Sequence, residues 1–285
     1  DLRLNFDTSF TGKDLLRTRL RSGNFSSDPF GSSSSLFKLD KAETTANQVE
    51  IDRLYYQFPV SKSVTLTAGP LVRNTEMSWV PSVYKSEILD FFAVAGTPGV
   101  YNKATGAGFG AQWKQPTQKG KGGLVASLNY VAQEGEFSDS GVFDSDGALN
   151  VLAQIGYRAP QWGVAVGYRY GGENTRPRTY NGLLGANGTL VDGQESNSVA
   201  LNAYWQPAQS GWVPSVSAGY GYNSVNGATG KTDATNSDSW FVGLQWSDVF
   251  VAGNSAGVAV GQAPSAETAG VSDATMIEIF YKYQV

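Results

Sequence analysis

The chain has 285 residues, enough for one large all-β domain or two ordinary domains, and its 21 basic and 25 acidic residues give a net charge of −4. This mild acidity argues against nucleic-acid binding, which normally needs a basic surface. The chain contains neither cysteine nor histidine, so disulfides are excluded and the commonest general base and zinc ligand are missing.

The composition is that of a β-rich chain in contact with lipid. Charged residues make up only 16%, against roughly 25% in typical soluble domains. Glycine reaches 34 residues and aromatic residues 12%. This blend is typical of outer-membrane barrels, in which each strand faces lipid on one side and water on the other. The sequence has no apolar run long enough for a membrane-spanning helix.

Alternating polar and apolar residues predict about 13 strands of about ten residues each. The first predicted strand places Leu2, Leu4 and Phe6 on one face and Arg3 and Asn5 on the other. In chain order, the predicted strands cover 1–10, 15–22, 48–58, 63–73, 105–114, 122–133, 149–158, 163–172, 196–205, 213–223, 238–246, 255–262 and 274–284.

The connections between these strands alternate between short and long. In an antiparallel meander every second connection lies at the same end, so this alternation predicts an antiparallel transmembrane β-barrel with short turns at one end and long external loops at the other. Because such barrels have an even number of strands, we expect this all-β chain to be part of a 16-stranded porin. The predicted long loops are 23–46, 74–103, 135–147, 173–194, 224–236 and 263–273.

The second predicted strand carries three arginines at alternate positions, between Leu16, Thr18 and Leu20. An arginine on the lipid face costs about 2–4 kcal/mol at the bilayer midplane, so the arginines must face the barrel interior. The same parity holds for three further arginines in other strands. The predicted basic pore-lining residues are Arg3, Arg17, Arg19, Arg21, Arg53 and Arg169.

Two interpretations of these arginines remain open at the sequence level. They can set a positive field across the pore, which selects solutes by charge and dipole and favours anions. They can also pair with Asp7, Glu50 and Asp52 on adjacent strands and so satisfy polar groups inside the barrel. Both can hold together.

The long connection 74–103 is too apolar for a loop in water. Its segment 85–95 has a composition compatible with a short helix that ends at Gly96, with Ser82 and Ser86 as possible caps. Insertion into the barrel lumen would place Glu76, Glu87 and Asp90 near the pore axis as acidic constriction residues. The alternative is packing over the barrel mouth or against a neighbouring subunit.

Two stretches carry a family resemblance: NFDTSFTGKDLLRTRLRSGNF at 5–25 and IDRLYYQFPVSKSVTLTAGP at 51–70. They resemble the cyanobacterial major outer-membrane porins of the Som family, whose barrel is related to the OprB carbohydrate-selective porins. The resemblance implies a homotrimer in outer-membrane lipid that passes small solutes and inorganic ions. It also implies an S-layer-homology domain and a coiled coil outside residues 1–285, which would be a single barrel domain truncated at both ends. Cell-wall anchoring would then lie outside this segment.

The sequence therefore predicts an outer-membrane porin for passive diffusion of small hydrophilic solutes and inorganic ions. One alternative is a substrate-selective, OprB-type carbohydrate channel. Such a channel needs aromatic side chains inside the pore, whereas Tyr168 and Tyr170 have the lipid-facing parity opposite to Arg169. A third hypothesis is a β-rich surface adhesin. No catalytic residues, cofactor or metal ligands are predicted.

Overall fold

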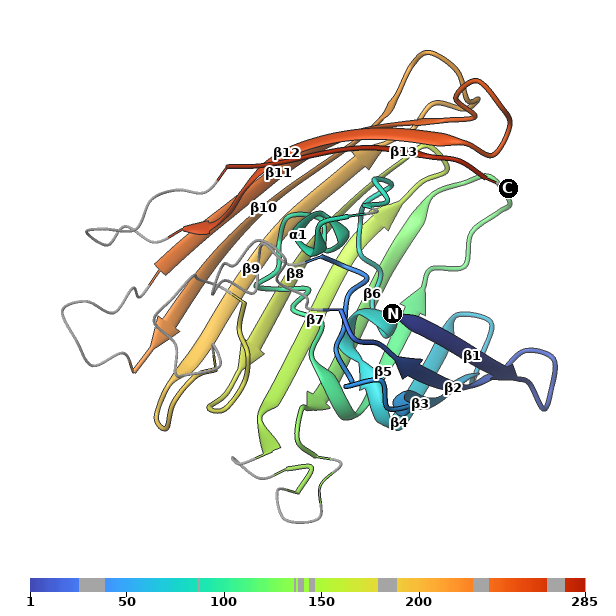
Figure 1. Ribbon diagram of the computed structural model, residues 1–285. Helices are drawn as coiled ribbons and strands as arrows, with labels where there is room; N and C mark the ends of the chain where they lie inside the picture. Colours follow the sequence, from blue (N-terminus) through green and yellow to red (C-terminus); the bar gives the residue numbers. More distant parts are fainter. Residues whose placement is uncertain are drawn as a thin grey trace.

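The computed structural model is a single antiparallel sheet that curls around a segment of its own chain (Figure 1). It describes residues 1–25, 39–86, 88–135, 137, 141–143, 147–178, 189–227, 236–265 and 275–284. The thirteen strands are β1 (Leu2–Thr8), β2 (Leu15–Ser22), β3 (Glu50–Pro59), β4 (Val64–Arg73), β5 (Thr105–Lys114), β6 (Gly123–Ala132), β7 (Leu149–Arg158), β8 (Trp162–Gly171), β9 (Glu195–Trp205), β10 (Ser215–Asn226), β11 (Asn236–Ser247), β12 (Ser255–Ser265) and β13 (Thr275–Lys282).

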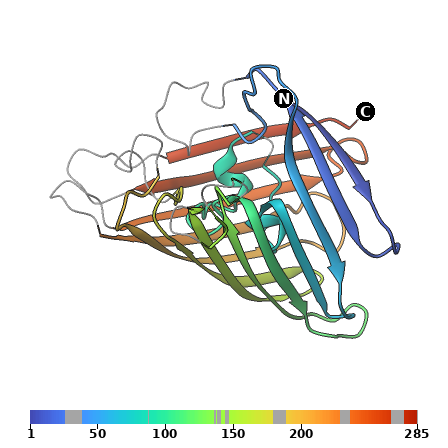
Figure 2. The same ribbon diagram turned by 90° about the horizontal axis from the view of Figure 1, so that it is seen from below.

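The strands follow one another in sequence order across the sheet, each paired antiparallel with the next, and β1 and β13 form its two edges. Figure 2 shows the sheet curving around the connection between β4 and β5. The predicted number and order of the strands and the all-β, antiparallel architecture are therefore confirmed.

The connections sort by length along most of the sheet. Those at 9–14, 60–63, 115–122 and 159–161 are short and share one end, which we call the turn end. The connections at 23–49, 74–104, 133–148 and 172–194 are longer and lie at the opposite, loop end. Beyond β9 the expected alternation weakens, because β10, β11 and β12 extend into the ranges predicted as the loops 224–236 and 263–273.

The two faces of the sheet differ as the alternation predicts. On β13, Ile277 and Ile279 are 63% and 72% exposed, whereas the intervening Glu278 is 2% exposed. Large apolar side chains are exposed at outward positions of nearly every strand and form a band suited to lipid. This outer band includes Leu2, Leu4, Phe6, Phe109, Leu128, Ile155, Val166, Tyr168, Val199, Leu201, Tyr220, Val242, Val260, Ile277 and Ile279.

The connection between β4 and β5 holds a 3₁₀ turn, η1 (Asn74–Glu76), and one α-helical turn, α1 (Asp90–Ala93). No described helix is long and apolar enough to cross a membrane. The predicted helix over 85–95 is too long. Ser86 does not cap it, since its hydroxyl lies 2.7 Å from the Leu89 carbonyl oxygen and 2.9 Å from a Glu278 carboxylate oxygen instead.

The connection 74–104, called the inserted segment below, contributes residues to all three hydrophobic clusters of the core. Phe91 and Phe92 are fully buried and pack with Phe241 of β11 and Phe280 of β13. Two smaller clusters form around Met77, against β3, β4 and β6, and around Tyr101, against β7 and β9. The apolar residues of this segment are therefore buried against the inner face of the sheet, as the lumenal alternative predicts.

The turn between β1 and β2 is organised by the carboxylate of Asp14. It accepts hydrogen bonds from the Ser9 hydroxyl at 2.8 Å, the Thr11 amide at 2.7 Å and the Tyr56 hydroxyl at 2.7 Å. Hydrogen bonding, first of all from Thr11, holds the pKa of Asp14 well below its usual range. The short turn is thus fixed by an ionised group.

Candidate pore

A wall of arginines lines the inner face of β1, β2 and β3. The strand register places Arg3 beside Arg21, and Arg19 beside Arg53. Leu4 of β1 pairs with Leu20 of β2 on the opposite, outward face. Below, the term arginine wall denotes this set of inward residues, which consists of Arg3, Arg17, Arg19, Arg21 and Arg53.

Carboxylates interleave with the guanidinium groups of the wall. Asp7 accepts two hydrogen bonds from Arg17, at 2.8 Å from Nε and 2.7 Å from Nη2. Asp52 accepts from Arg19 Nε at 2.6 Å and from Arg53 Nη1 at 2.8 Å. These paired geometries are those of strong, charge-assisted hydrogen bonds.

The loop-end part of the wall is also paired. Asp1 accepts from Arg3 and Arg21, and Glu43 lies 2.8 Å from Arg21 Nη1. The prediction of pairing is confirmed for Asp7 and Asp52. It is wrong for Glu50, which lies opposite Arg21 in the register but makes no ion pair with it.

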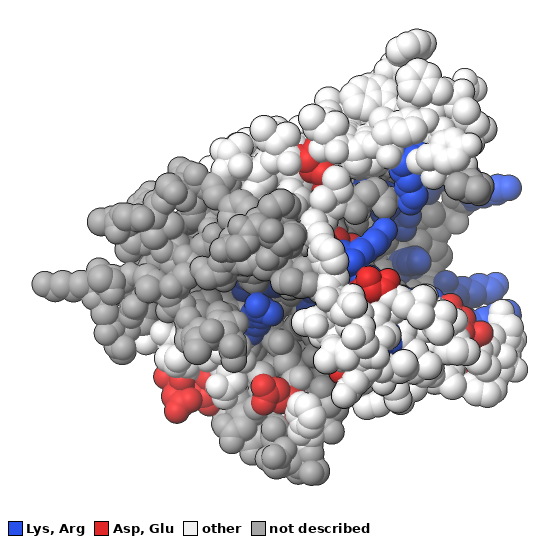
Figure 3. All heavy atoms as spheres, in the orientation of Figure 1, with Lys and Arg blue, Asp and Glu red and all other residues white. Residues whose placement is uncertain are grey.

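Because carboxylates accompany the arginines, their positive field is largely compensated. Basic and acidic side chains are both visible in the hollow of the face drawn in Figure 3.

The inserted segment is held against β13 by the buried carboxylate of Glu278. Its oxygens accept from the Tyr84 hydroxyl at 2.8 Å and the Ser86 hydroxyl at 2.9 Å. They also accept from the backbone amides of Ile88 at 3.2 Å and Leu89 at 2.6 Å. A buried carboxylate without a cation is tolerated where several donors satisfy its lone pairs. Glu278 therefore fixes the middle of the inserted segment.

A buried ion cluster fixes the next part of the segment. Asp90, at the start of α1, is 1% exposed and pairs with Lys103 and with Arg178 from the connection after β8. Lys103 also reaches Asp40 at 2.5 Å. The prediction that Asp90 faces the pore axis is therefore wrong, because the carboxylate neutralises two cations inside the packed core.

Of the other two predicted acidic constriction residues, Glu76 and Glu87, the structure describes only Glu76. Glu76 binds Arg53 Nε at 2.9 Å and the Arg73 amide at 3.0 Å, so it continues the row of paired charges at the edge of the wall. Glu87 lies outside the described residues.

Three of the predicted pore-lining arginines are buried, and Arg21 is one of them, at 7% exposure beside Asp1 and Glu43. Arg169 on β8 is fully buried beneath the inserted segment, where it donates to the Gly99 carbonyl and, at 2.9 and 2.8 Å, to Asn150 and Ser196. Arg53 is fully buried between Asp52 and Glu76. Arg53 and Arg169 point inward as the alternation predicts, but the expectation that they line open water is wrong, because residues of the inserted segment, Glu76 and Gly99, lie against them.

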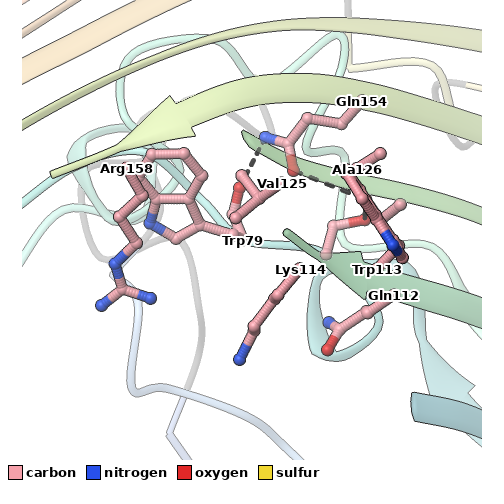
Figure 4. Close-up of a pocket in the computed structure, with 10 residues that line it drawn as sticks. Trp79, Gln112, Trp113, Lys114, Val125, Ala126, Gln154 and Arg158 are labelled. Atoms are coloured by element: carbon pink, nitrogen blue, oxygen red, sulfur yellow. Dashed lines mark hydrogen bonds between the residues drawn. The ribbon is translucent and has the colours of Figure 1, made fainter. Parts of the chain in front are cut away.

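Sequence reasoning missed a pocket at the turn end, below the inserted segment (Figure 4). Its polar lining comes from Gln112 and Lys114 on β5, Ser127 on β6, and Gln154 and Arg158 on β7. Strand alternation alone predicts that Gln112 and Lys114 face inward, since they have the parity opposite to the outward Phe109. The closing residue, Trp79, comes from the inserted segment, whose course alternation does not give.

Comparisons with known proteins agree with this architecture. No family model matches the chain. Two uncharacterised cyanobacterial proteins cover all of it: one from Synechocystis sp. at 25% identity over 316 residues, and one from Nostoc sp. at 28% over 326 residues. The alignments cover 56% and 54% of those proteins, so the chain spans about half the length of the curated relatives it matches.

Among solved structures, OprB of Pseudomonas putida is similar to the chain with a TM-score of 0.53 at 11% identity, covering 91% of this chain and 67% of that one. This likeness shows the fold, an antiparallel porin-type β-barrel. The apolar outer band and polar inner face of the curled sheet are the surface pattern of an outer-membrane β-barrel.

Proposed function

We propose that this protein is a porin for passive diffusion of small hydrophilic solutes and inorganic ions. The observation that carries the proposal is the inserted segment inside a barrel whose inner face is charged and polar. The segment meets the arginine wall where Glu76 pairs with Arg53, and Arg17 and Arg3 keep 28% and 26% of their side-chain surface exposed. A charged inner face that is partly exposed beside an inserted segment supports a channel role, because charged groups lining a passage let ions pass.

The selectivity we propose is weak. The guanidinium groups of Arg17, Arg19 and Arg21 each face a carboxylate, so neither sign of charge dominates along the wall. Solutes would then be sorted mainly by size and dipole, with a small tilt toward anions. We expect no catalytic activity and no resident cofactor.

The test is conductance of the purified protein in a planar lipid bilayer. We expect stepwise currents in potassium chloride that glucose and maltose do not block. An absence of current steps, with the protein shown to be inserted, would contradict the porin function. Current steps that a sugar blocks in a saturable manner would instead support the carbohydrate-selective alternative.

The carbohydrate alternative has one supporting observation, the fold shared with OprB. Against it, Tyr168 is 40% exposed on the outward face, and its hydroxyl donates to Asn197 rather than into the interior. The aromatic rings of β8 are therefore not available to stack on a sugar in the pore.

We further propose that the barrel is a homotrimer in outer-membrane lipid, as the resemblance to the Som family implies, and that residues 1–285 form one barrel domain of a longer protein. Cell-wall anchoring would belong to a domain outside this segment. Native mass spectrometry in detergent tests the trimer: a monomer as the only species would refute it.

A further inference from the structure

The pocket at the turn end is a cavity of about 240 Å³ on the inner face of β5, β6 and β7. We call it the turn-end pocket. Pockets for drug-sized ligands measure about 300–1,000 Å³, so this one suits a smaller solute. Its position beside the turn-end mouth places it where a solute would enter or leave the barrel.

The strand register builds its polar floor. Gln112, Ser127 and Gln154 are direct neighbours across β5, β6 and β7, so they form one row. Lys114 follows Gln112 on the same face, one step closer to the turn end, and Arg158 lies two steps beyond Gln154. Their side chains therefore lie on the same side of the sheet, as Figure 4 shows.

Trp79 closes the pocket and is rigidly seated. Gln154 Nε2 donates to its backbone carbonyl at 2.6 Å, and its ring packs edge-to-face on Tyr204 with centroids 5.9 Å apart. On β8, a Cβ at Gly163 would lie 2.7 Å from the Tyr204 ring and 2.8 Å from the indole, so glycine is needed for this close approach. The Arg158 guanidinium carbon lies 5.6 Å from the indole centroid, a cation–π distance that orients the guanidinium group.

The charges of the pocket set it apart from the arginine wall. Lys114 and Arg158 are both exposed, and within the described part of the chain neither has a carboxylate partner. No acidic residue is among those that line the pocket. Two uncompensated cations in a concave site concentrate small anions there.

We propose that the turn-end pocket binds a small divalent oxyanion of the phosphate or sulfate type. The fork of Arg158 suits two oxygens of a tetrahedral anion, Lys114 supplies a second positive charge, and the Gln112 amide supplies a neutral donor. This inference deepens the proposed porin function by naming a solute class, and it moves anion recognition from the arginine wall to the turn end.

The test measures binding and conduction separately. Calorimetric titration of the detergent-solubilised protein with inorganic phosphate should show saturable binding, which sulfate displaces and chloride at equal concentration does not. Since hydrogen bonds to charged groups are strong, Lys114→Gln and Arg158→Gln should each weaken phosphate binding about tenfold or more. Arg158→Lys, which keeps the charge and loses the fork, should fall between wild type and Arg158→Gln.

The matched control is the double variant Lys119→Gln/Lys121→Gln. It removes two exposed cations from the turn between β5 and β6, outside the pocket, and should change the affinity by less than about twofold. Equal weakening in the control, or wild-type affinity in Lys114→Gln/Arg158→Gln, would overturn the site. A wild-type channel that conducts chloride but neither binds phosphate nor is blocked by it would refute the site and leave the porin function standing. Phosphate binding without any conductance would support the site and contradict the porin function.

Discussion

Replacing Glu278 with alanine removes the acceptor that holds the inserted segment against β13. The carboxylate is 2% exposed and receives four hydrogen bonds, two from side-chain hydroxyls and two from the backbone amides of Ile88 and Leu89. After the substitution the hydroxyls can rotate to other acceptors, whereas the two amides stay where the backbone places them. The consequence is a local loss of anchoring, since the strand pairing of β12 and β13 does not depend on this side chain.

The structure gives the size of this effect. A buried donor left without a partner costs about 1–3 kcal/mol, so the two amides alone cost roughly 2–6 kcal/mol. Because about 1.4 kcal/mol corresponds to a factor of ten, the open state of the segment should become at least about 30-fold more populated. Amide hydrogen exchange reports such local opening directly.

The assay is hydrogen exchange followed by mass spectrometry on the peptide that spans 84–93. Exchange in this peptide should accelerate in Glu278→Ala and not in Glu134→Ala, which removes an exposed carboxylate outside the strands. Single-channel records should show noisier current in the first variant only. Unchanged exchange in Glu278→Ala would refute the conclusion that this carboxylate anchors the inserted segment.

Three further predictions test the wall, the short turn and the pocket. Changing Arg17, Arg19 and Arg21 together to serine leaves the paired carboxylates uncompensated, so the reversal potential in a salt gradient should shift toward cation preference; an unchanged potential would place the wall outside the constriction. The folded-state pKa of Asp14 lies below its ordinary value of 3.8. The ionised carboxylate therefore contributes its full stabilisation of the folded state above pH 3.8, and this contribution is lost as the pH falls further. Thermal unfolding of Asp14→Asn should therefore show a constant deficit between pH 5 and 8 that shrinks in stronger acid, and a deficit that varies across the neutral range would contradict this assignment. Gly163→Ala should destabilise the fold by about 1–3 kcal/mol through overpacking against the rings of Tyr204 and Trp79, measured as a lower unfolding midpoint, and wild-type stability would show that both rings can move away.

The arginines show what strand alternation predicts and what it does not. Parity alone places Arg17 and Arg169 on the inner face, because both alternate with apolar residues in their strands. Parity does not distinguish their environments: Arg17 remains partly exposed beside Asp7, and Arg169 is sealed beneath Gly99. The difference comes from the inserted segment, whose position depends on contacts between residues far apart in the chain.

The same limit explains the acidic residues. Composition predicts that the connection after β4 folds into the lumen, since its apolar residues need a buried surface. It does not predict that Asp90 meets Arg178, a residue 88 positions later, or that Glu278 holds the segment from the last strand. Such pairings follow from the curvature of the whole sheet.

By itself the sequence determined the strands, their antiparallel order, the facing of most strand side chains and the short turns, because a two-residue period and local turn chemistry are properties of neighbouring residues. The tertiary structure alone decided which inward charges are exposed, paired or buried, and it alone assembled the turn-end pocket from three strands and Trp79. The physical reason is that burial and ion pairing depend on distances between segments remote in the chain, which only the curled sheet and the segment within it define.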